Sequence, residues 1–129
     1  MDDMPLKGSA EWLDLLDDVV SDTTGVPLKN IYSRQATRRT ATARKLIYYV
    51  LAVYLGWGTP QIGKRYNRDH TTVRSALLGA IDWIEFRFKP SMCQSLRRIK
   101  VKMMLEEGLV ETSETVLSAR RAAQKAYRM

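Results

Sequence analysis

The sequence predicts an all-α protein, on three observations. Apolar residues recur at intervals of three and four along most of the chain, which is the period of an amphipathic helix. Proline and glycine stand where these periodic segments begin and end. No segment alternates with the period of two that a strand would show. The 129 residues are expected to form one helical domain, 1–107, followed by a C-terminal helical extension, 108–129.

The first periodic segment predicts an amphipathic helix over residues 10–24. Ser9 suits the N-cap position, and Gly25 offers a C-terminal stop. The apolar face is formed by Trp12, Leu13, Leu15, Leu16, Val19 and Val20. The other face is expected to carry Asp14, Asp17 and Asp18.

A short helix, a basic loop and a central helix are predicted next. Pro27 suits the first turn of a helix over 28–33. The stretch 34–43 has no apolar period and is predicted to be a loop. From Arg44 the chain is apolar on nearly every side until Gly56, which is typical of a buried central helix.

Two helices joined by a tight turn are predicted after this central helix. Thr59 is expected to cap, and Pro60 to open, a helix over 61–66. Asp69 is expected to cap a longer helix whose apolar residues recur at three and four until Pro90. The turn between them holds Asn67, a residue that tolerates the left-handed conformation. This arrangement is that of a helix-turn-helix.

Two further helices are predicted over 91–107 and 113–127, separated by Gly108. The last one has a face of small residues, namely Val116, Ala119, Ala122, Ala123 and Ala126. This face could dock on the body of the protein, or it could pair with a second copy to form a homodimer through 108–129. The sequence leaves both arrangements open.

Positive charge is concentrated in the middle of the chain. The net charge of +7 divides into −5 over 1–30, +8 over 31–74 and +4 over 75–129. A strongly cationic segment attracts polyanions, so nucleic acid is the leading candidate partner. The alternative for such a run is a solvated basic face.

The cysteine and histidine content excludes several kinds of site. Cys93 is the only cysteine, which rules out an intramolecular disulfide and fits a reducing compartment. His70 is the only histidine, so the three or four N/S ligands of a zinc site are lacking. We therefore expect no metal and no cofactor. The N-terminus lacks the features of a signal peptide, and the most apolar stretch, 46–57, is too short to span a bilayer. A cytoplasmic protein without a membrane partner is expected.

One segment nearly matches the phosphate-binding P-loop: Gly58-Thr59-Pro60-Gln61-Ile62-Gly63-Lys64-Arg65. Arg65 stands where the P-loop has the hydroxyl that holds magnesium. A P-loop also follows a strand, whereas Pro60 places this segment in a helix. Nucleotide binding is therefore not expected.

The start of the second helix of the motif carries the residues suited to reading DNA. His70, Thr71, Thr72 and Arg74 precede or flank the first apolar residue, Val73. Their side chains can meet base edges or phosphates. The structural alternative is that Asp69 and the threonines only cap the helix and that His70 is a surface imidazole. The neighbouring cations Lys64, Arg65 and Arg68 favour the functional interpretation, because a cap alone does not require them.

The run Arg68-Asp69-His70-Thr71-Thr72-Val73 resembles the signature of the C-terminal DNA-binding domain of the bacterial replication initiator DnaA. Pro60-Gln61-Ile62-Gly63 is similar to the start of the helix before the turn in that family. Ala43-Arg44-Lys45 falls where the family opens its central helix. In all, residues 12–105 can be laid along the family domain. The resemblance implies a compact bundle of six to seven helices, like those of the Trp repressor and the DnaA C-terminal domain.

The resemblance also implies roles for single residues. Asp69, His70, Thr71 and Thr72 would enter the major groove, Pro60 would touch a thymine-rich part of the site, and Arg44, Lys45 and Arg68 would grip phosphates. Three positions depart from the family. The turn is one residue shorter, Ser75 replaces a common second histidine, and Ala36 falls on the minor-groove arginine, so that Arg34, Arg38 or Arg39 would have to replace it.

The sequence thus predicts a nucleoid-associated, non-enzymatic protein that binds double-stranded DNA with sequence preference and regulates transcription or replication. Its length leaves no room for the ATPase module of the initiator, so a freestanding reader is expected. Affinity is expected from Arg34, Arg38, Arg39, Arg44, Lys45, Lys64, Arg65 and Arg68. One alternative is a protein-interaction module that contacts the replication machinery. Another is a small hydrolase or nuclease, against which Asp69 is the only acid between residues 31 and 74.

Overall fold

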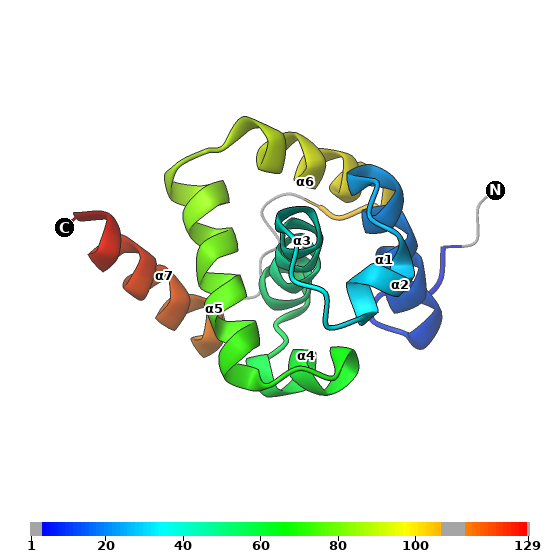
Figure 1. Ribbon diagram of the computed structural model, residues 1–129, viewed down its shortest axis with the longest axis horizontal. Coiled ribbons are helices and arrows are strands. Elements are labelled where there is room, and N and C mark those ends of the chain that lie inside the picture. The colour runs from blue at the N-terminus through cyan, green and yellow to red at the C-terminus, as the bar shows by residue number, and fades with distance from the viewer. Residues whose placement is uncertain (1–3, 107–112, 129) are drawn as a thin grey trace.

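The computed structural model describes residues 4–106 and 113–128, and these residues form helices joined by short connections (Figure 1). The elements are α1 (Ala10–Thr24), α2 (Leu28–Tyr32), α3 (Arg38–Leu55), α4 (Thr59–Tyr66), α5 (His70–Ile81), the π-helical η1 (Asp82–Phe86), α6 (Pro90–Lys102) and α7 (Glu114–Arg128). The described residues contain no strand, which confirms the all-α prediction. None of their helices is long and apolar enough to cross a membrane.

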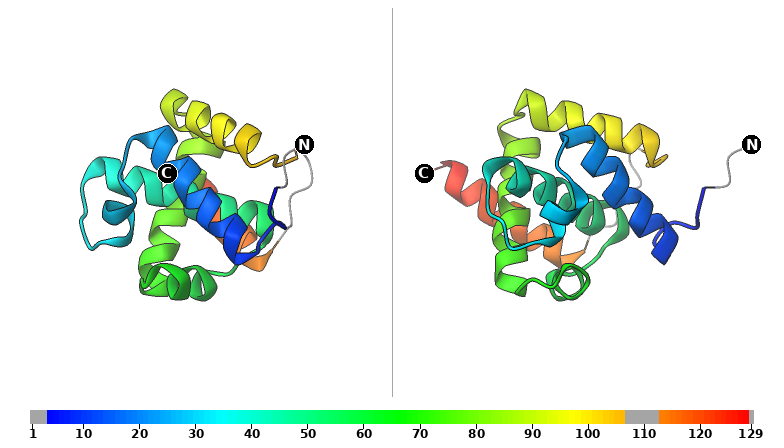
Figure 2. Two further views of the ribbon diagram at one scale, coloured as in Figure 1. Left: turned by 90° about the vertical axis from the view of Figure 1, so that its right-hand side faces the viewer. Right: turned by 45° about the vertical axis from the view of Figure 1, so that its right-hand side comes forward.

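Helix α3 is the centre of the fold. Every side chain from Leu46 to Tyr54 is buried, and α3 contacts each of the other α-helices. The other helices surround it, with α4 and α6 at opposite ends of the molecule in each view (Figures 1 and 2). A helix that is apolar on all sides is stable only when it is enclosed in this way.

The helix ends confirm several predicted signals and correct one. The Ser9 hydroxyl accepts a hydrogen bond from the Trp12 amide at 3.2 Å, and Gly25 and Gly56 end α1 and α3 at φ of 75° and 74°. Glycine adopts this left-handed conformation without steric cost. The prediction that Thr59 caps α4 is wrong, because Gly58 is the N-cap residue and Thr59 already lies in the helix.

Most of the predicted basic loop over 34–43 is helical, so this prediction is wrong. The Thr37 hydroxyl accepts a hydrogen bond from the Thr40 amide at 3.2 Å, and α3 begins at Arg38. The first turn of α3 is largely exposed and therefore shows no apolar period. Thr40 and Ala43, 2% and 0% exposed, are the first inward-facing side chains of α3.

The helix predicted to run to Pro90 changes its hydrogen bonding before it ends. After Ile81 the chain forms the π-helical turn η1, in which the Arg87 amide donates to the Asp82 carbonyl at 2.8 Å. Helix α6 ends at Lys102 rather than at residue 107, with Met104 at a φ of 55°. Residue 107 itself lies outside the described residues.

Helix α7 begins where it was predicted and packs on the body. The Ser113 hydroxyl accepts a hydrogen bond from the Val116 amide at 3.2 Å. Val116, Ala119 and Ala123 are buried, and α7 contacts α5 and η1. The structure therefore shows docking within the chain, of the two arrangements that the sequence left open. Pairing with a second copy stays a prediction.

Candidate nucleic-acid interface

Helices α4 and α5 form a helix-turn-helix at one end of the molecule (Figure 1). Asn67 has φ 54° and ψ 53°, which confirms the left-handed turn residue. The amide of Arg68 then donates to the Gly63 carbonyl at 2.8 Å and closes the turn. Ile62 and Tyr66, four residues apart, bury the inner face of α4.

Gly63 is required by the close approach of this turn. A Cβ atom at Gly63 would collide with the carbonyl oxygen of Arg68, which is backbone and cannot move aside as a flexible side chain would. We expect Gly63→Ala to lower the free energy of unfolding by about 1 to 3 kcal/mol, the usual cost of overpacking. Urea unfolding measures this change. Gly58→Ala is the control, because a Cβ there meets its neighbours at 3.6 Å or more; an equal loss for the two variants would contradict the argument.

The first residues of α5 are exposed while its apolar face is buried. His70, Thr71, Thr72, Arg74 and Ser75 are all exposed, whereas Val73 and Leu77 are 0% exposed. The predicted orientation of this helix is therefore confirmed. Because Val73 and Leu77 pack in the core, α5 presents to solvent the side chains that can contact bases.

Asp69 caps α5 as predicted. Its carboxylate accepts a hydrogen bond from the Thr71 amide at 3.2 Å, and this bond lowers the pKa of Asp69 below its ordinary value. The Nδ1 atom of His70 lies 3.2 Å from the same carboxylate, and both side chains are about two-thirds exposed. The carboxylate is thus held at the helix N-terminus, where a negative charge is favourable.

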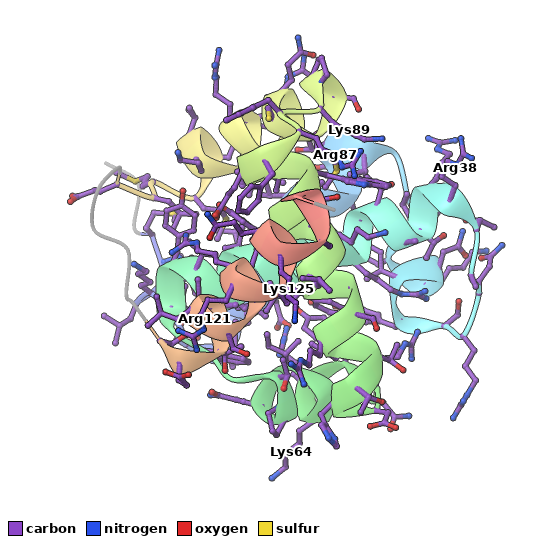
Figure 3. The ribbon with its side chains drawn as sticks, turned by 90° about the vertical axis from the view of Figure 1, so that its left-hand side faces the viewer. Arg38, Lys64, Arg87, Lys89, Arg121 and Lys125 are labelled. Atoms are coloured by element: carbon purple, nitrogen blue, oxygen red, sulfur yellow. The ribbon has the colours of Figure 1, made fainter. Side chains whose placement is uncertain are left out.

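The predicted cationic residues divide into two groups. In the first group the side chains extend into solvent, and Arg38 and Lys64 are seen doing so in Figure 3. Among the described residues, no hydrogen bond or ion pair occupies the side chains of Arg34, Arg38, Lys64 and Arg74. Arg39 is also exposed and donates to the Thr24 carbonyl at 3.2 Å. Pro60 is exposed beside Lys64 on α4.

In the second group the charged side chains are engaged within the protein. The Arg44 guanidinium donates to the carbonyls of Asn30, Ile31, Ser33 and Gln35. Arg68 donates to the Ser33 carbonyl as well, and to the carbonyls of Tyr66 and Asn67. These two arginines therefore tie the loop 33–37 to the turn of the helix-turn-helix.

Lys45 packs beside α5. Its ammonium group lies 4.5 Å from the centre of the Trp83 ring, a cation–π contact, and burial lowers its pKa. Its aliphatic chain covers Gly79. Lys45 thus holds α3 and α5 together on one side of α5.

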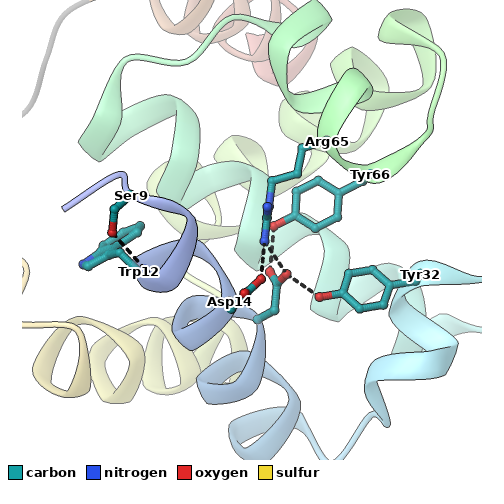
Figure 4. Close-up of polar contacts among 7 residues, drawn as sticks. Ser9, Trp12, Asp14, Tyr32, Arg65 and Tyr66 are labelled. Carbon is teal, nitrogen blue, oxygen red and sulfur yellow. Dashed lines mark hydrogen bonds and ion pairs between the residues drawn. The ribbon is translucent and has the colours of Figure 1, made fainter. Parts of the chain in front are cut away.

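A buried carboxylate anchors α4 to the body. Asp17 of α1 is 0% exposed and accepts hydrogen bonds from the Tyr32 and Tyr66 hydroxyls, each at 2.6 Å. The Arg65 guanidinium lies 3.1 Å from Asp17 and 3.3 Å from the exposed Asp14 (Figure 4). One carboxylate thereby joins α1, α2 and α4.

The expectation that Asp17 lies on the polar face of α1 is wrong. Position 17 follows Leu13 by four and precedes Val20 by three, so it belongs to the buried stripe. This spacing was the signal that a buried acid with partners was present. Burial raises the pKa of Asp17 above its ordinary value, and the bonds from the two tyrosines and Arg65 offset part of that increase.

The described residues contain no cluster of three His, Cys, Asp or Glu side chains that could hold a metal ion. The segment that resembles a P-loop forms the start of α4, and within the described ranges no strand precedes it. Gly63 faces the turn of the motif. This segment therefore forms the first helix of the motif, and the absence of nucleotide binding stays a prediction.

Comparisons with known proteins agree with this geometry. The family model described as "Bacterial dnaA protein helix-turn-helix" matches residues 13–78, from within α1 to the last turn of α5. The chromosomal replication initiator protein DnaA of Thermotoga maritima is 28% identical over 106 residues, which cover 82% of this chain and 22% of that protein. The chain thus spans about a fifth of that relative, and no solved structure matches significantly. Because the family match spans half of the chain and contains the whole turn and the exposed start of α5, this protein belongs to the bacterial DnaA helix-turn-helix family.

Proposed function

We propose that the protein binds double-stranded DNA with sequence preference and has no catalytic activity of its own. The observation that carries the proposal is the exposure of His70, Thr71 and Thr72 on a helix whose opposite face is buried. In a helix-turn-helix these positions reach base edges in the major groove. Membership of the DnaA helix-turn-helix family supports DNA binding.

DNA binding would involve base-contacting residues and phosphate-contacting residues. Asp69, His70, Thr71 and Thr72 would read bases, with Pro60 beside them. Phosphates would be met by the exposed side chains of Arg34, Arg38, Arg39, Lys64 and Arg74. Because phosphate contacts position a protein and base contacts specify the site, the two groups should respond differently to substitution.

A second set of cations would contribute mainly by positioning the DNA-binding surface, namely Arg44, Lys45, Arg65 and Arg68. Arg44 and Arg68 hold the loop that carries Arg34. Arg65 and Lys45 hold α4 and α5 in place. Their charges still add to the cationic field that attracts a duplex.

The biological role would be regulation of transcription or of replication. The DnaA relative is named as a chromosomal replication initiator, which favours a site at or near a replication origin. Both roles require the same chemistry from this chain, namely selective attachment to a duplex.

Selection of bound sites from random duplex DNA, followed by binding measurements, tests the proposal. Thr72→Ala should weaken binding to the selected site by about 1 to 3 kcal/mol and leave binding to random duplex nearly unchanged. Arg38→Gln is the control and should weaken binding to both duplexes alike. Equal losses on both duplexes for Thr72→Ala would exclude direct reading by this residue.

The dependence on salt provides the second readout. Neutralisation of about five phosphates gives a slope of log K against log salt near −4.5. Five exposed cations around the motif match this value. Absence of binding to any duplex at about 0.1 M salt would overturn the proposal and favour a protein-interaction module instead.

A further inference from the structure

The outward face of α5 is bordered by two different elements. On one side lies α3, whose Lys45 side chain covers Gly79. On the other side lies α7. Ser75 and Leu78 of α5 and Asp82 of η1 share an open hollow of about 260 Å³ with Ala123 and Ala126 of α7. Helix α5 is thus flanked by other helices on two sides.

Helix α7 packs against α5 and crosses it obliquely (Figures 1 and 3). At the start of α7, Thr115 and Ser118 line a second hollow with Arg74 and Leu77 of α5. Towards the other end of α7, the first hollow joins the same two helices. Helix α7 therefore lies against the helix that would enter the major groove.

The attachment of α7 is specific. Arg120 donates two hydrogen bonds to the Glu85 carboxylate, at 2.8 and 3.0 Å, and the Tyr49 hydroxyl donates to the same group at 2.7 Å. Paired bonds between a guanidinium and a carboxylate fix orientation as well as distance. With Val116 and Ala123 buried beside this ion pair, the rotation of α7 about its axis is set.

That rotation turns a cationic stripe outward. Arg121 and Lys125 are four residues apart and exposed, on the side of α7 opposite Val116 and Ala123. Arg121 is 64% exposed and forms an ion pair with Glu114 at 2.9 Å, whereas Lys125 has no hydrogen bond or ion pair with a described residue. Figure 3 shows the two on the same face as other cationic side chains, namely Arg38, Lys64, Arg87 and Lys89.

We propose that α7 is a second phosphate-binding element, in which Arg121 and Lys125 contact the DNA backbone beside the recognition helix. A helix in the major groove has a phosphate backbone on each side, because the groove is only about 12 Å wide. Arg34, in the loop before α3, and Arg38, in its first turn, are exposed on the side of α5 where α3 packs, and α7 packs against α5 as well. Residues 113–128 lie outside the family match, which ends at residue 78. The inference rests on the proposed function, since it requires α5 to lie in the groove.

The double variant Arg121→Gln/Lys125→Gln tests this inference. Each lost phosphate contact changes the slope of log K against log salt by about 0.9. We expect the slope to become shallower by about 1.8, and affinity at about 0.1 M salt to fall by about 10- to 100-fold on the selected site and on random duplex alike. Fluorescence anisotropy with a labelled duplex, over a series of salt concentrations, measures both quantities.

The matched control is Arg97→Gln/Lys102→Gln, which removes the same charge from exposed positions of α6. Helix α6 lies at the end of the molecule opposite α4 (Figures 1 and 2), so its slope should remain that of the wild type. Both double variants change exposed side chains, so their melting temperatures should match the wild type.

The possible results separate the two proposals. If the wild type binds duplex and the α7 variant keeps the wild-type slope, or loses no more than the α6 control, the role of α7 is overturned and the proposed function stands. If the wild type binds no duplex, both fail. Loss of a dimer in sedimentation without a change of slope would assign the stripe to pairing of copies and would also overturn the inference.

Discussion

Asp17→Ala is expected to lower the free energy of unfolding by about 3 kcal/mol, because it removes the acceptor shared by Tyr32, Tyr66 and Arg65. Removal of one partner from a buried ion pair leaves the other charge uncompensated, which costs about 3 to 5 kcal/mol. The lower end applies here, since the Arg65 side chain is 23% exposed to water and keeps its ion pair with Asp14. Chemical unfolding followed by circular dichroism measures the loss.

Single hydroxyl deletions are the controls for this prediction. Tyr32→Phe and Tyr66→Phe each remove one donor and should cost about 1 kcal/mol. If Asp17→Ala costs no more than either of them, the carboxylate does not join the three helices as described.

The pH dependence of Asp17 has a definite sign. Burial raises its pKa in the folded protein above the ordinary value of 3.8, so the unfolded chain loses this proton first as the pH rises. The contribution of Asp17 to stability is then greatest at low pH and falls as the pH passes from the ordinary pKa to the folded one. Asp17→Asn cannot titrate, so the stability of the wild type relative to this variant should decline over that interval.

Arg44→Ala is expected to destabilise the protein by about 2 to 4 kcal/mol and to weaken DNA binding on selected and random duplexes alike. Its guanidinium donates hydrogen bonds to the carbonyls of Asn30, Ile31, Ser33 and Gln35. Hydrogen bonds to charged groups contribute about 1.5 to 3 kcal/mol each, and these contributions are not additive. Loss of these bonds frees the loop that carries Arg34. Unfolding and anisotropy measurements on the same variant report both effects.

Arg44→Lys keeps the charge and distinguishes geometry from electrostatics. An ammonium group cannot reproduce the planar fork of donors that reaches four carbonyls, so this variant should recover little of the lost stability. Full recovery of stability and of DNA binding by lysine would show that Arg44 acts through its charge alone.

Local signals predicted the start and turn of the motif well. Ser9, Asn67 and Asp69 have the predicted capping and turn conformations, because a cap depends on a side chain and the few amides next to it. The exposed start of α5 was also predicted, since Val73 and Leu77 set which side of the helix is buried. These features depend on residues within about one turn of each other.

Features that depend on residues far apart in the sequence were not predicted. The start of α3 at Arg38 was not recognised, because its first turn faces solvent and carries no apolar period. Asp17 was placed on the surface, and Arg44 and Arg65 were assigned to phosphate, because their partners lie between 9 and 51 residues away along the chain. The assignment to phosphate stays a prediction, while the contacts within the protein are now described.

The amino-acid sequence by itself determined that this protein is helical, that α4 and α5 form a helix-turn-helix, and that the residues at the start of α5 are exposed; that these residues read DNA stays a prediction. Only the tertiary structure decided which cations remain in solvent, and that α7 docks against α5 with its basic stripe outward. The physical reason is how far apart in the sequence the interacting residues lie. Helix period, caps and turns depend on neighbours in the chain, whereas burial of a charge and its hydrogen-bond partners depend on which helices the hydrophobic core brings together.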